Sequence, residues 1–413
     1  GEPFHDAARA AFELREQLAS DKRRLAFLMG AGTSMAVGVP GIDDLTSEVE
    51  KELSETMKQL YGAVRSDLGD GANVENVLDR VRLLRELLGK GDDKKHNGLT
   101  GKNSRELDIS ICKAIRDIVC EEPAKGMSPH TTFAQWLYAS YSSRGWPVEV
   151  FTTNYDLLFE RSMEQVGVPF FDGFIGSVAP FFAPESVDTD IRTQEGVYPP
   201  RTWTRLWKLH GSVNWHILKE GSDRKSYVSR LSGHAPVGDD QLMIFPTREK
   251  YIDSRRLPFL TYQDRLRHFL SSGESVLFIL GYSFSDEHLN EIIFQGLRGN
   301  NRLAVNALMF GVPEKDGDTK CLSAPVAEYG RTYRNMSVYG PDKAVIGGVE
   351  GKWSAPPQKK SDHEALSYWS DQENRFLLGD FYAFASYLER VLGFGNEDRI
   401  ARASSTEATE GKA

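Results

Sequence analysis

The sequence predicts an α/β protein with a doubly wound parallel sheet and a helical insert as a second, smaller domain. Short apolar runs typical of buried parallel strands alternate with segments in which apolar residues recur every three or four positions. Glycine or polar residues directly follow several of these runs, where open α/β sheets place their ligands. These two observations predict a Rossmann-like arrangement of strands and helices.

The strands are placed from their apolar runs and from the turn residues that end them. An amphipathic helix over residues 6–22 precedes the first strand. The predicted strands are Leu25–Met29, Val148–Phe151, Leu206–Leu209, Leu242–Phe245, Ser275–Leu280, Asn306–Phe310 and Met336–Tyr339. A helix capped by Ser285 is expected after residues 275–280, whereas residues 167–205 show no clear period.

A helical pattern begins at Asp43 and predicts an insert domain over residues 43–145. Within it, Asn73 is expected to cap a helix, and Ser128 with the following proline is expected to start another. The polar stretch Gly89–Glu106 is expected to be an exposed, mobile loop.

The remaining residues, 1–42 and 146–395, are expected to form the Rossmann-like domain. Its last element is an amphipathic helix over Phe376–Leu392. The polar segment 396–413 is expected to be a disordered tail.

Composition excludes several classes of protein. The chain has 413 residues, of which 40% are hydrophobic and 26% are charged. It contains no run of eighteen apolar residues, so we expect no membrane span. Its net charge is −9, so we expect no direct nucleic-acid binding. Its first residues lack the basic start and apolar stretch of a secretory signal peptide. The three cysteines form no C-x-x-C pair, which predicts a cytoplasmic protein without a disulfide framework or a bound metal.

Two polar segments follow the first two long strands. The first is a glycine turn whose backbone N–H groups suit a pyrophosphate, although Met35 breaks the G-x-G-x-x-G pattern and a plain strand-to-helix turn is the alternative. The second places an amide and a carboxylate at a strand end, where capping of the next helix is the alternative. These segments are Gly30-Ala31-Gly32-Thr33-Ser34 and Thr153-Asn154-Tyr155-Asp156.

Two further segments follow later strands. His210 ends an apolar strand and precedes a glycine, so it is a candidate general base, although a lone histidine is more often structural. His216 is the weaker candidate nearby. Gly281 and Ser283, at the start of a helix, suit a phosphate or a ribose, with an ordinary helix cap as the alternative.

Together the four segments resemble the sirtuin family in type and in order. Counterparts of its G-A-G-x-S, T-x-N-x-D, L-H-G and G-x-S segments are spread over residues 25–286. The resemblance implies a sirtuin-like fold that takes NAD⁺ as its substrate.

The resemblance also implies a role for each segment. The loop Gly30–Ser34 would hold the pyrophosphate of NAD⁺. Asn154 would lie beside the nicotinamide ribose, and Asp156 would help to seat the nicotinamide end. His210 would act as the base, and the glycine-serine segment with Ser283 would lie near the adenosine.

Three departures from the sirtuin deacetylases change the expected activity. No cysteine occurs from residue 121 to 320, so the family's zinc ribbon is missing. The segment Gly38–Asp43 lacks the arginine of the family's G-x-P-D-F-R, and the helical insert is large. The chain therefore resembles the sirtuin-like NADases of bacterial anti-phage defence. Its size and Phe-rich C-terminal helix suggest the members that partner a HerA-type hexameric ATPase.

We therefore expect an NAD⁺ glycohydrolase that releases nicotinamide and ADP-ribose. In this hypothesis Asn154 orients a water at the anomeric carbon, and His210 takes a proton from it or from a ribose hydroxyl. Capture to a cyclic product and the choice between NAD⁺ and NADP⁺ stay open. Because constant NAD⁺ loss would kill the cell, we expect control through a homo-oligomer or a partner protein.

Three alternatives compete with this interpretation. The first is a protein deacylase or ADP-ribosyltransferase, which the missing ribbon disfavours. The second is a non-catalytic sensor of NAD⁺ or ADP-ribose, which would need neither Asn154 nor His210. The third is a Rossmann dehydrogenase, which the incomplete glycine pattern disfavours.

Overall fold

The computed structural model describes residues 3–69, 71–120, 127–187, 199–220, 225–231, 241–243, 258–313, 320–356 and 365–391. The tail predicted at 396–413 lies outside these residues, as do residues 244–245 of one predicted strand. Within the described residues, no helix is both long and apolar enough to cross a membrane.

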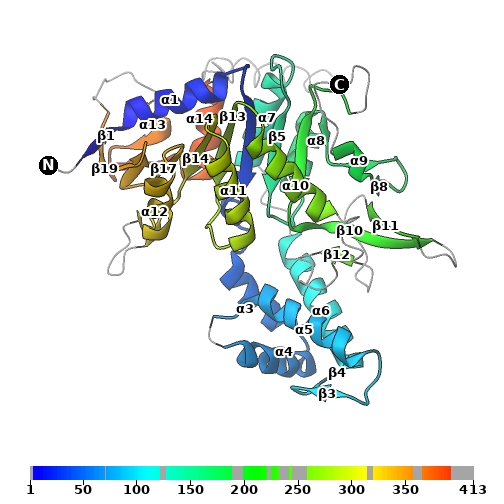
Figure 1. Ribbon diagram of the computed structural model, residues 1–413. Helices are drawn as coiled ribbons and strands as arrows, with labels where there is room; N and C mark the ends of the chain where they lie inside the picture. Colours follow the sequence, from blue (N-terminus) through cyan, green and yellow to red (C-terminus); the bar gives the residue numbers. More distant parts are fainter. Residues whose placement is uncertain are drawn as a thin grey trace, which may run out of the picture.

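A ten-stranded, mainly parallel sheet forms the centre of the molecule (Figure 1) and confirms the predicted α/β class. From one edge to the other, its strands are β1 (Phe4–Asp6), β19 (Val349–Ser354), β18 (Lys343–Ile346), β17 (Met336–Tyr339), β14 (Leu303–Leu308), β13 (Ser275–Leu280), β2 (Arg24–Met29), β5 (Val148–Thr152), β9 (Thr204–Lys208) and β6 (Phe170–Phe171). All strands from β17 to β6 run parallel, and β18 is antiparallel to both of its neighbours.

The sheet is doubly wound about β2. From β2 the chain moves outward to β5 and β9, and it then returns to the other side of β2 to form β13, β14 and β17. The direction of winding therefore reverses between β2 and β13. At such a reversal the loops after the two strands diverge, and open α/β sheets bind their ligands in the resulting crevice.

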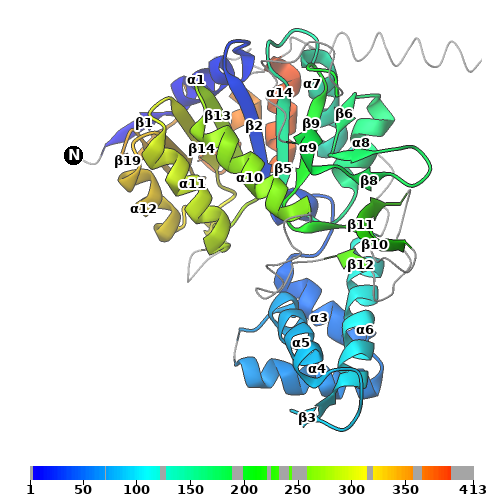
Figure 2. The same ribbon diagram turned by 45° about the vertical axis from the view of Figure 1, so that its right-hand side comes forward.

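Helices cover both faces of the sheet, as the alternation of side chains along β2 requires. Leu25, Phe27 and Met29 pack in one core, which includes α1 (Ala7–Ala19), α7 (Pro129–Ser140) and α14 (Phe381–Val391). Ala26 and Leu28 pack in the other core, under α10 (Pro258–Ser271), α11 (Glu287–Gly299) and α12 (Ala324–Thr332) (Figure 2).

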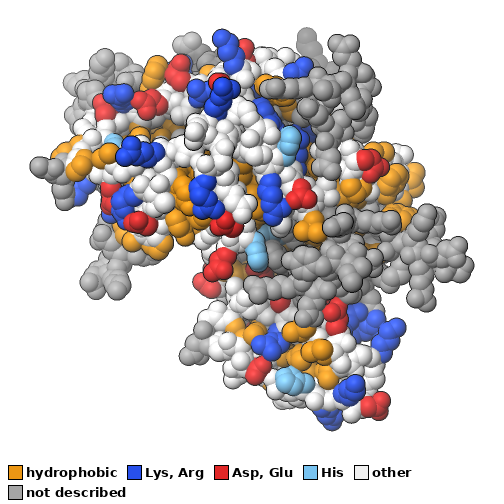
Figure 3. All heavy atoms as spheres, in the orientation of Figure 1, with side chains coloured by type: hydrophobic (Ala, Val, Ile, Leu, Met, Phe, Trp, Pro, Cys, Tyr) orange, Lys and Arg blue, Asp and Glu red, His pale blue; other side chains and the backbone are white. Residues whose placement is uncertain are grey.

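Four helices form a separate helical lobe beyond the carboxyl ends of the parallel strands (Figure 1). They are α3 (Ile42–Glu52), α4 (Glu55–Leu68), α5 (Val74–Leu88) and α6 (Gly101–Val119). The lobe has its own hydrophobic core, and Leu157 and Val213 from the rest of the chain belong to it. The molecule narrows where the lobe meets the sheet, and basic and acidic side chains are interspersed on the face shown in Figure 3.

Part of the predicted mobile loop Gly89–Glu106 is ordered as regular structure, and that prediction was wrong for its second half. Strands β3 (Lys95–His96) and β4 (Leu99–Thr100) pair, and α6 begins at Gly101. Thr100 caps α6 through the N–H of Asn103, whose side chain accepts from the N–H of Thr100. This reciprocal cap starts a helix despite the polar composition. The predicted cap at Asn73 is confirmed for α5, and that at Ser128 for α7.

Two further sequence predictions differ from the structure. A second sheet, in the order β12-β10-β11-β8-β7, was not predicted as a sheet, although β12 overlaps the predicted strand Leu242–Phe245. Its strands are β7 (Phe174–Ile175), β8 (Phe181–Phe182), β10 (Gly211–Glu220), β11 (Lys225–Arg230) and β12 (Gln241–Met243). Strands β7 and β8 lie within residues 167–205, where the sequence shows no clear period. The last helix begins at Phe381 rather than Phe376, because Phe376 belongs to strand β21 (Arg375–Phe376) and Asp380 accepts from the N–H of Ala383.

Candidate functional site

Two glycine loops meet at the crevice between β2 and β13. The N–H of Gly30 donates to the carbonyl of Leu280, and the N–H of Gly32 donates to that of Gly281, both at 2.9 Å. A Cβ on Gly32 would lie 2.7 Å from Cα of Gly281, so a side chain there would push the loops apart. Close packing of the two loops therefore requires glycine. These two N–H groups already have protein acceptors, and other groups of the loop would have to donate to a phosphate.

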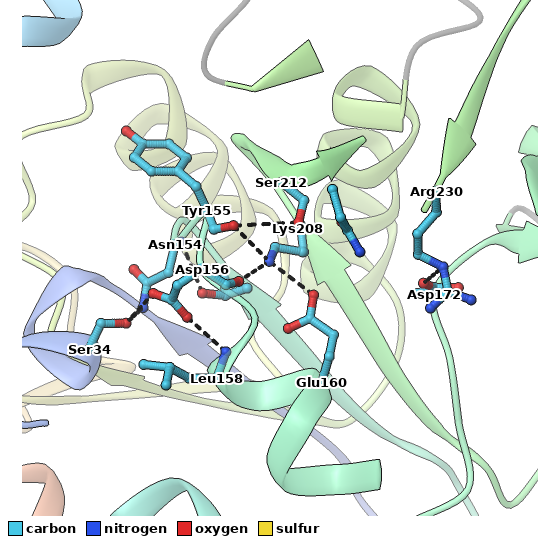
Figure 4. Close-up of polar contacts among 12 residues, drawn as sticks. Ser34, Asn154, Tyr155, Asp156, Leu158, Glu160, Asp172, Lys208, Ser212 and Arg230 are labelled. Carbon is cyan, nitrogen blue, oxygen red and sulfur yellow. Dashed lines mark hydrogen bonds and ion pairs between the residues drawn. The ribbon is translucent and has the colours of Figure 1, made fainter. Parts of the chain in front are cut away.

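Three predicted site residues form one hydrogen-bonded group (Figure 4). The amide nitrogen of Asn154 donates to the hydroxyl of Ser34 at 2.7 Å, and that hydroxyl donates to Oδ2 of Asp156 at 2.6 Å. All three residues are buried. The same Asn154 nitrogen lies 3.1 Å from the hydroxyl of Thr33. The amide nitrogen of Asn154 is thus directed toward the first glycine loop, which begins α2 (Ala31–Met35), and the side-chain oxygen points away from that nitrogen within the same amide plane.

Asp156 also bonds the first residue of the next helix, although the N-cap of that helix is Leu157 and not Asp156. Its Oδ1 accepts from the N–H of Leu158 at 3.0 Å, at the start of α8 (Leu158–Val166). Both carboxylate oxygens therefore have protein donors. This arrangement holds the side chain in one orientation beside Ser34.

The buried Lys208 holds the main chain of this segment in place. No role was predicted for it from the sequence. The Lys208 ammonium donates to the carbonyls of Tyr155 and Asp156 and forms an ion pair of 2.9 Å with Glu160 (Figure 4). Burial raises the pKa of Glu160, and the charge of Lys208 opposes that shift. Lys208 therefore fixes the main chain between Asn154 and α8. The sequence did contain a signal for this role, because Lys208 is a charged residue at the end of an apolar strand.

His210 forms the second polar group of the site. Its Nε2 lies 3.0 Å from Oδ2 of Asp286, and both residues are shielded from solvent. Oδ1 of Asp286 accepts from the N–H groups of His288 and Leu289, at 2.9 and 3.0 Å. Asp286 is therefore the N-cap of α11, and the prediction of Ser285 as the cap was wrong by one residue. An aspartate fits better because its two oxygens can satisfy the helix and the histidine at once.

Residues 148–330 match a SIR2-like domain. The matched segment contains Asn154, Asp156, His210 and Asp286, whereas the loop Gly30–Ser34 precedes it. No curated protein matches the chain.

Solved structures of Sir2 proteins are similar to this chain. One is a Sir2 homologue in complex with NAD, 15% identical, with a TM-score of 0.34 over 71% of this chain and 81% of that chain. Another is a mutant Sir2 homologue in complex with ADP ribose, 13% identical, with a TM-score of 0.31 over 71% and 83%. A third, from work on the mechanism and regulation of Sir2 enzymes, is 13% identical, with a TM-score of 0.32 over 76% and 91%.

Within the matched segment, two hydrogen bonds of Asn290 hold the loop after β13 in place. The side-chain nitrogen of Asn290 donates to the carbonyl of Phe284 at 2.7 Å, and its oxygen accepts from the hydroxyl of Tyr282 at 2.9 Å. Phe284 has a φ of +58°, which is unusual for a residue with a side chain. Ser283 is exposed, and its hydroxyl lies 2.7 Å from that of Ser285. Ser283 therefore lies at the crevice, outside the two buried polar groups.

The helical lobe also brings a carboxylate close to His210 and Asp286. Glu75 lies in the first turn of α5 and interacts electrostatically with His210 and Asp286. Burial raises the pKa of Glu75, the charge of His210 opposes this, and the charges of Asp79 and Asp286 add to it. Glu75 had no sequence signal, because only the fold brings α5 to the carboxyl edge of the sheet.

The candidate site thus consists of two polar groups joined through main chain. The carbonyl of Tyr155, next to Asn154, accepts from the N–H of Val213 at 3.0 Å and from the hydroxyl of Ser212 at 3.4 Å, just beyond His210. His216 lies further along β10, opposite Ser229. Among the described residues, no cluster of three histidine, cysteine or acidic side chains is arranged to hold a metal ion.

Proposed function

We propose that this chain is an NAD⁺ glycohydrolase that cleaves NAD⁺ to nicotinamide and ADP-ribose. One observation carries the proposal. Asn154 and the His210–Asp286 pair lie at the carboxyl edge of the sheet, beside the reversal of strand order, within the segment that matches a SIR2-like domain.

The proposed chemistry divides the reaction between the two polar groups. Loss of nicotinamide, which leaves as a neutral group, generates positive charge on the ribose. The carbonyl oxygen of Asn154 accepts a hydrogen bond from a water or a ribose hydroxyl, since its nitrogen already donates to Ser34. His210 takes the proton, and the bound adenosine half positions the reacting carbon.

A protein deacylase is the less favoured activity for this site. The segment from residue 121 to 320 contains no cysteine, so the zinc ribbon of the sirtuin deacetylases cannot form. Incubation with NAD⁺ and an acetyl-lysine peptide separates the two reactions. Deacetylated peptide with matching nicotinamide release would establish the deacylase instead.

We further propose that the activity is controlled by assembly, either as a homo-oligomer or with a HerA-type hexameric ATPase, in anti-phage defence. The support is physical. The helical lobe packs Leu157 and Val213, which neighbour Asp156 and the segment after His210, into its own core, so contacts on the lobe can reach the site. Equal NAD⁺ turnover by a dilute monomer and by concentrated or partner-bound protein would exclude this control.

The decisive experiment follows NAD⁺ loss and identifies the products by chromatography. The purified wild-type chain, Asn154→Ala and His210→Ala are compared, with His216→Ala as the matched control from the same segment. We expect nicotinamide and ADP-ribose from wild type and His216→Ala and no turnover from the other two. Near-wild-type turnover by Asn154→Ala or His210→Ala would refute these roles. NAD⁺ binding without turnover, with or without partners, would identify a sensor.

A further inference from the structure

We infer that Asp286 is a positioning residue for the base: it holds the Nε2–H of His210, so that the lone pair of the neutral imidazole is on Nδ1. The inference rests on the proposed function in one respect, which is that His210 is taken to be the general base. The contact between the two residues, 3.0 Å between Nε2 and Oδ2, does not depend on it.

The two carboxylate oxygens of Asp286 accept hydrogen bonds from different partners. Oδ1 is held by two helical N–H groups, those of His288 and Leu289, so the carboxylate cannot rotate freely. Oδ2 therefore faces His210 in a fixed position. An ionised carboxylate has only acceptor sites, so the imidazole nitrogen that faces it must be the donor. This fixes the tautomer of the neutral ring.

The loop that carries Asp286 is built to hold this position. Phe284 has a φ of +58°, and such a conformation persists only where the surroundings enforce it. Asn290, one turn into α11, enforces it by bonding the carbonyl of Phe284 and the hydroxyl of Tyr282. The same hydroxyl lies 3.2 Å from the carbonyl of Asp286. The strained loop and the helix start thus place one carboxylate oxygen opposite His210.

The charges around this pair favour an ionised Asp286. Burial acts to raise the pKa of Asp286, but the hydrogen bond from His210 and the two helical N–H groups favour the ionised form and the pKa is lowered. Glu75 on α5 also faces His210 and Asp286, and Asp79 on α5 faces Glu75. Asp286 is the carboxylate with a hydrogen bond to Nε2, so it sets the orientation of the ring.

The test compares Asp286→Asn and Asp286→Ser with wild type. Asparagine can keep the helix cap through its oxygen, but its NH₂ then faces Nε2 and favours the opposite tautomer, with the proton on Nδ1. Serine keeps a capping oxygen and removes the contact to the histidine. Asp6 caps α1 through the N–H groups of Ala8 and Arg9, so Asp6→Asn and Asp6→Ser are matched controls at a second helix start.

We expect kcat to fall about 10²- to 10⁴-fold in Asp286→Asn, the range for loss of general base catalysis, with KM for NAD⁺ unchanged. We expect kcat to fall in Asp286→Ser as well, because the contact that holds the Nε2–H of His210 is gone. Asp6 variants should keep wild-type kcat and pH profile. An unchanged kcat in both Asp286 variants, or a rise in KM alone, would overturn the positioning role.

Nitrogen NMR of the His210 ring tests the same inference without turnover. Wild type should show the proton on Nε2, and Asp286→Asn should show it on Nδ1, whereas both Asp6 variants should match wild type. The same tautomer in wild type and Asp286→Asn would overturn the inference even if NAD⁺ is hydrolysed. If wild type does not hydrolyse NAD⁺, a change of the His210 tautomer between wild type and Asp286→Asn would still show that Asp286 positions His210. Only the proposed function would then fail.

Discussion

Ser34 donates a hydrogen bond of 2.6 Å to Asp156 across the gap between the first two central strands, although the two residues lie 122 positions apart in the chain. The same hydroxyl accepts from Asn154 at 2.7 Å. A single buried hydroxyl thus connects the amide assigned to catalysis with the carboxylate assigned to the nicotinamide end. Five consequences of this and other contacts can be measured.

Replacing Ser34 by alanine should leave Asn154 without its shortest acceptor and Oδ2 of Asp156 without its donor, while Oδ1 keeps the N–H of Leu158. A hydrogen bond to a charged group contributes about 1.5–3 kcal/mol, so we expect kcat/KM for NAD⁺ to fall by about 10- to 100-fold. The control is Ser47→Ala, because the hydroxyl of Ser47 donates to the carbonyl of Asp43 on the exposed side of a helix and, among the described residues, contacts no group of the site. Equal kcat/KM in the two variants would show that the hydroxyl does not support the site.

Gly281→Ala should separate the two glycine loops. Gly281 has a φ of +63°, and its Cβ would lie 2.6 Å from the main-chain nitrogen of Thr33. The left-handed conformation alone costs alanine about 1–2 kcal/mol, and the contact adds to it. We expect a lower melting temperature and weaker NAD⁺ turnover.

The matched control for Gly281→Ala is Gly62→Ala. Gly62 lies within α4, and no atom lies within 4 Å of its added Cβ. Alanine in a helix interior should stabilise the protein by about 0.5–1 kcal/mol. If Gly281→Ala melts no lower than wild type, the loop packing described here is not required.

Glu149→Gln should be strongly destabilising. Glu149 is 1% exposed, and its carboxylate accepts from Arg265 at 2.7 and 2.8 Å and from Trp207 at 2.9 Å. Loss of its charge leaves Arg265 buried without full compensation, at a cost of about 3–5 kcal/mol. Urea unfolding at neutral pH measures the loss. Glu291→Gln, in an exposed pair with Arg298, should change stability by less than about 1 kcal/mol.

The pH dependence of Glu149 has a defined sign. Burial acts to raise its pKa, but Arg265, Arg24 and Trp207 outweigh burial and lower the pKa to about 2. Because the folded value lies below the ordinary value of about 4.3, the stabilisation is present above that value and is lost as the pH falls toward 2. The gap in unfolding free energy between wild type and Glu149→Gln should therefore narrow in acid. A gap independent of pH would contradict the ionised pair.

His130→Leu should reduce the acid sensitivity of the fold. His130 is buried against Phe159 and Phe381, and neither ring nitrogen has a hydrogen-bond partner among the described residues. Burial lowers its pKa to about 4, and the charge of Asp156 only partly opposes this. On acidification, His130 therefore binds a proton in the unfolded chain at a higher pH than in the folded chain. The free energy of unfolding falls as the pH drops from about 6.5 to about 4.

The measurement is the unfolding free energy at pH 7 and pH 5. Wild type should lose stability between these two values, and His130→Leu should lose less. His96→Leu, on the exposed strand β3, is the control and should follow wild type. The same loss in all three proteins would show that His130 does not drive the acid sensitivity.

Apolar runs were sufficient to predict the central strands. The strands at 275–280 and 336–339 have the predicted ends, because each run is mainly apolar and is bounded by turn residues. Asn306–Phe310 was misplaced, since β14 covers Leu303–Leu308. Alternation was too weak to predict the second sheet, in which β7 and β8 have two residues each.

The site was predicted in its parts but not in its pairings. Asn154, Asp156 and His210 each follow a strand, so their positions at one sheet edge could be inferred from the sequence. The partner of His210 could not, because Asp286 is 76 residues away and resembles an ordinary helix cap. Glu75 depends on how the helical lobe packs, which no local pattern encodes.

The core of the helical lobe contains Leu157, which follows Asp156, and Val213, which lies three residues after His210. A protein interior is close-packed, so a rotation of the lobe must displace both residues or open a void. Binding in the crevice and binding on the lobe are then thermodynamically linked. A macromolecule that prefers one orientation of the lobe would change the affinity of the crevice for its ligand, and that ligand would change the affinity for the macromolecule by the same factor.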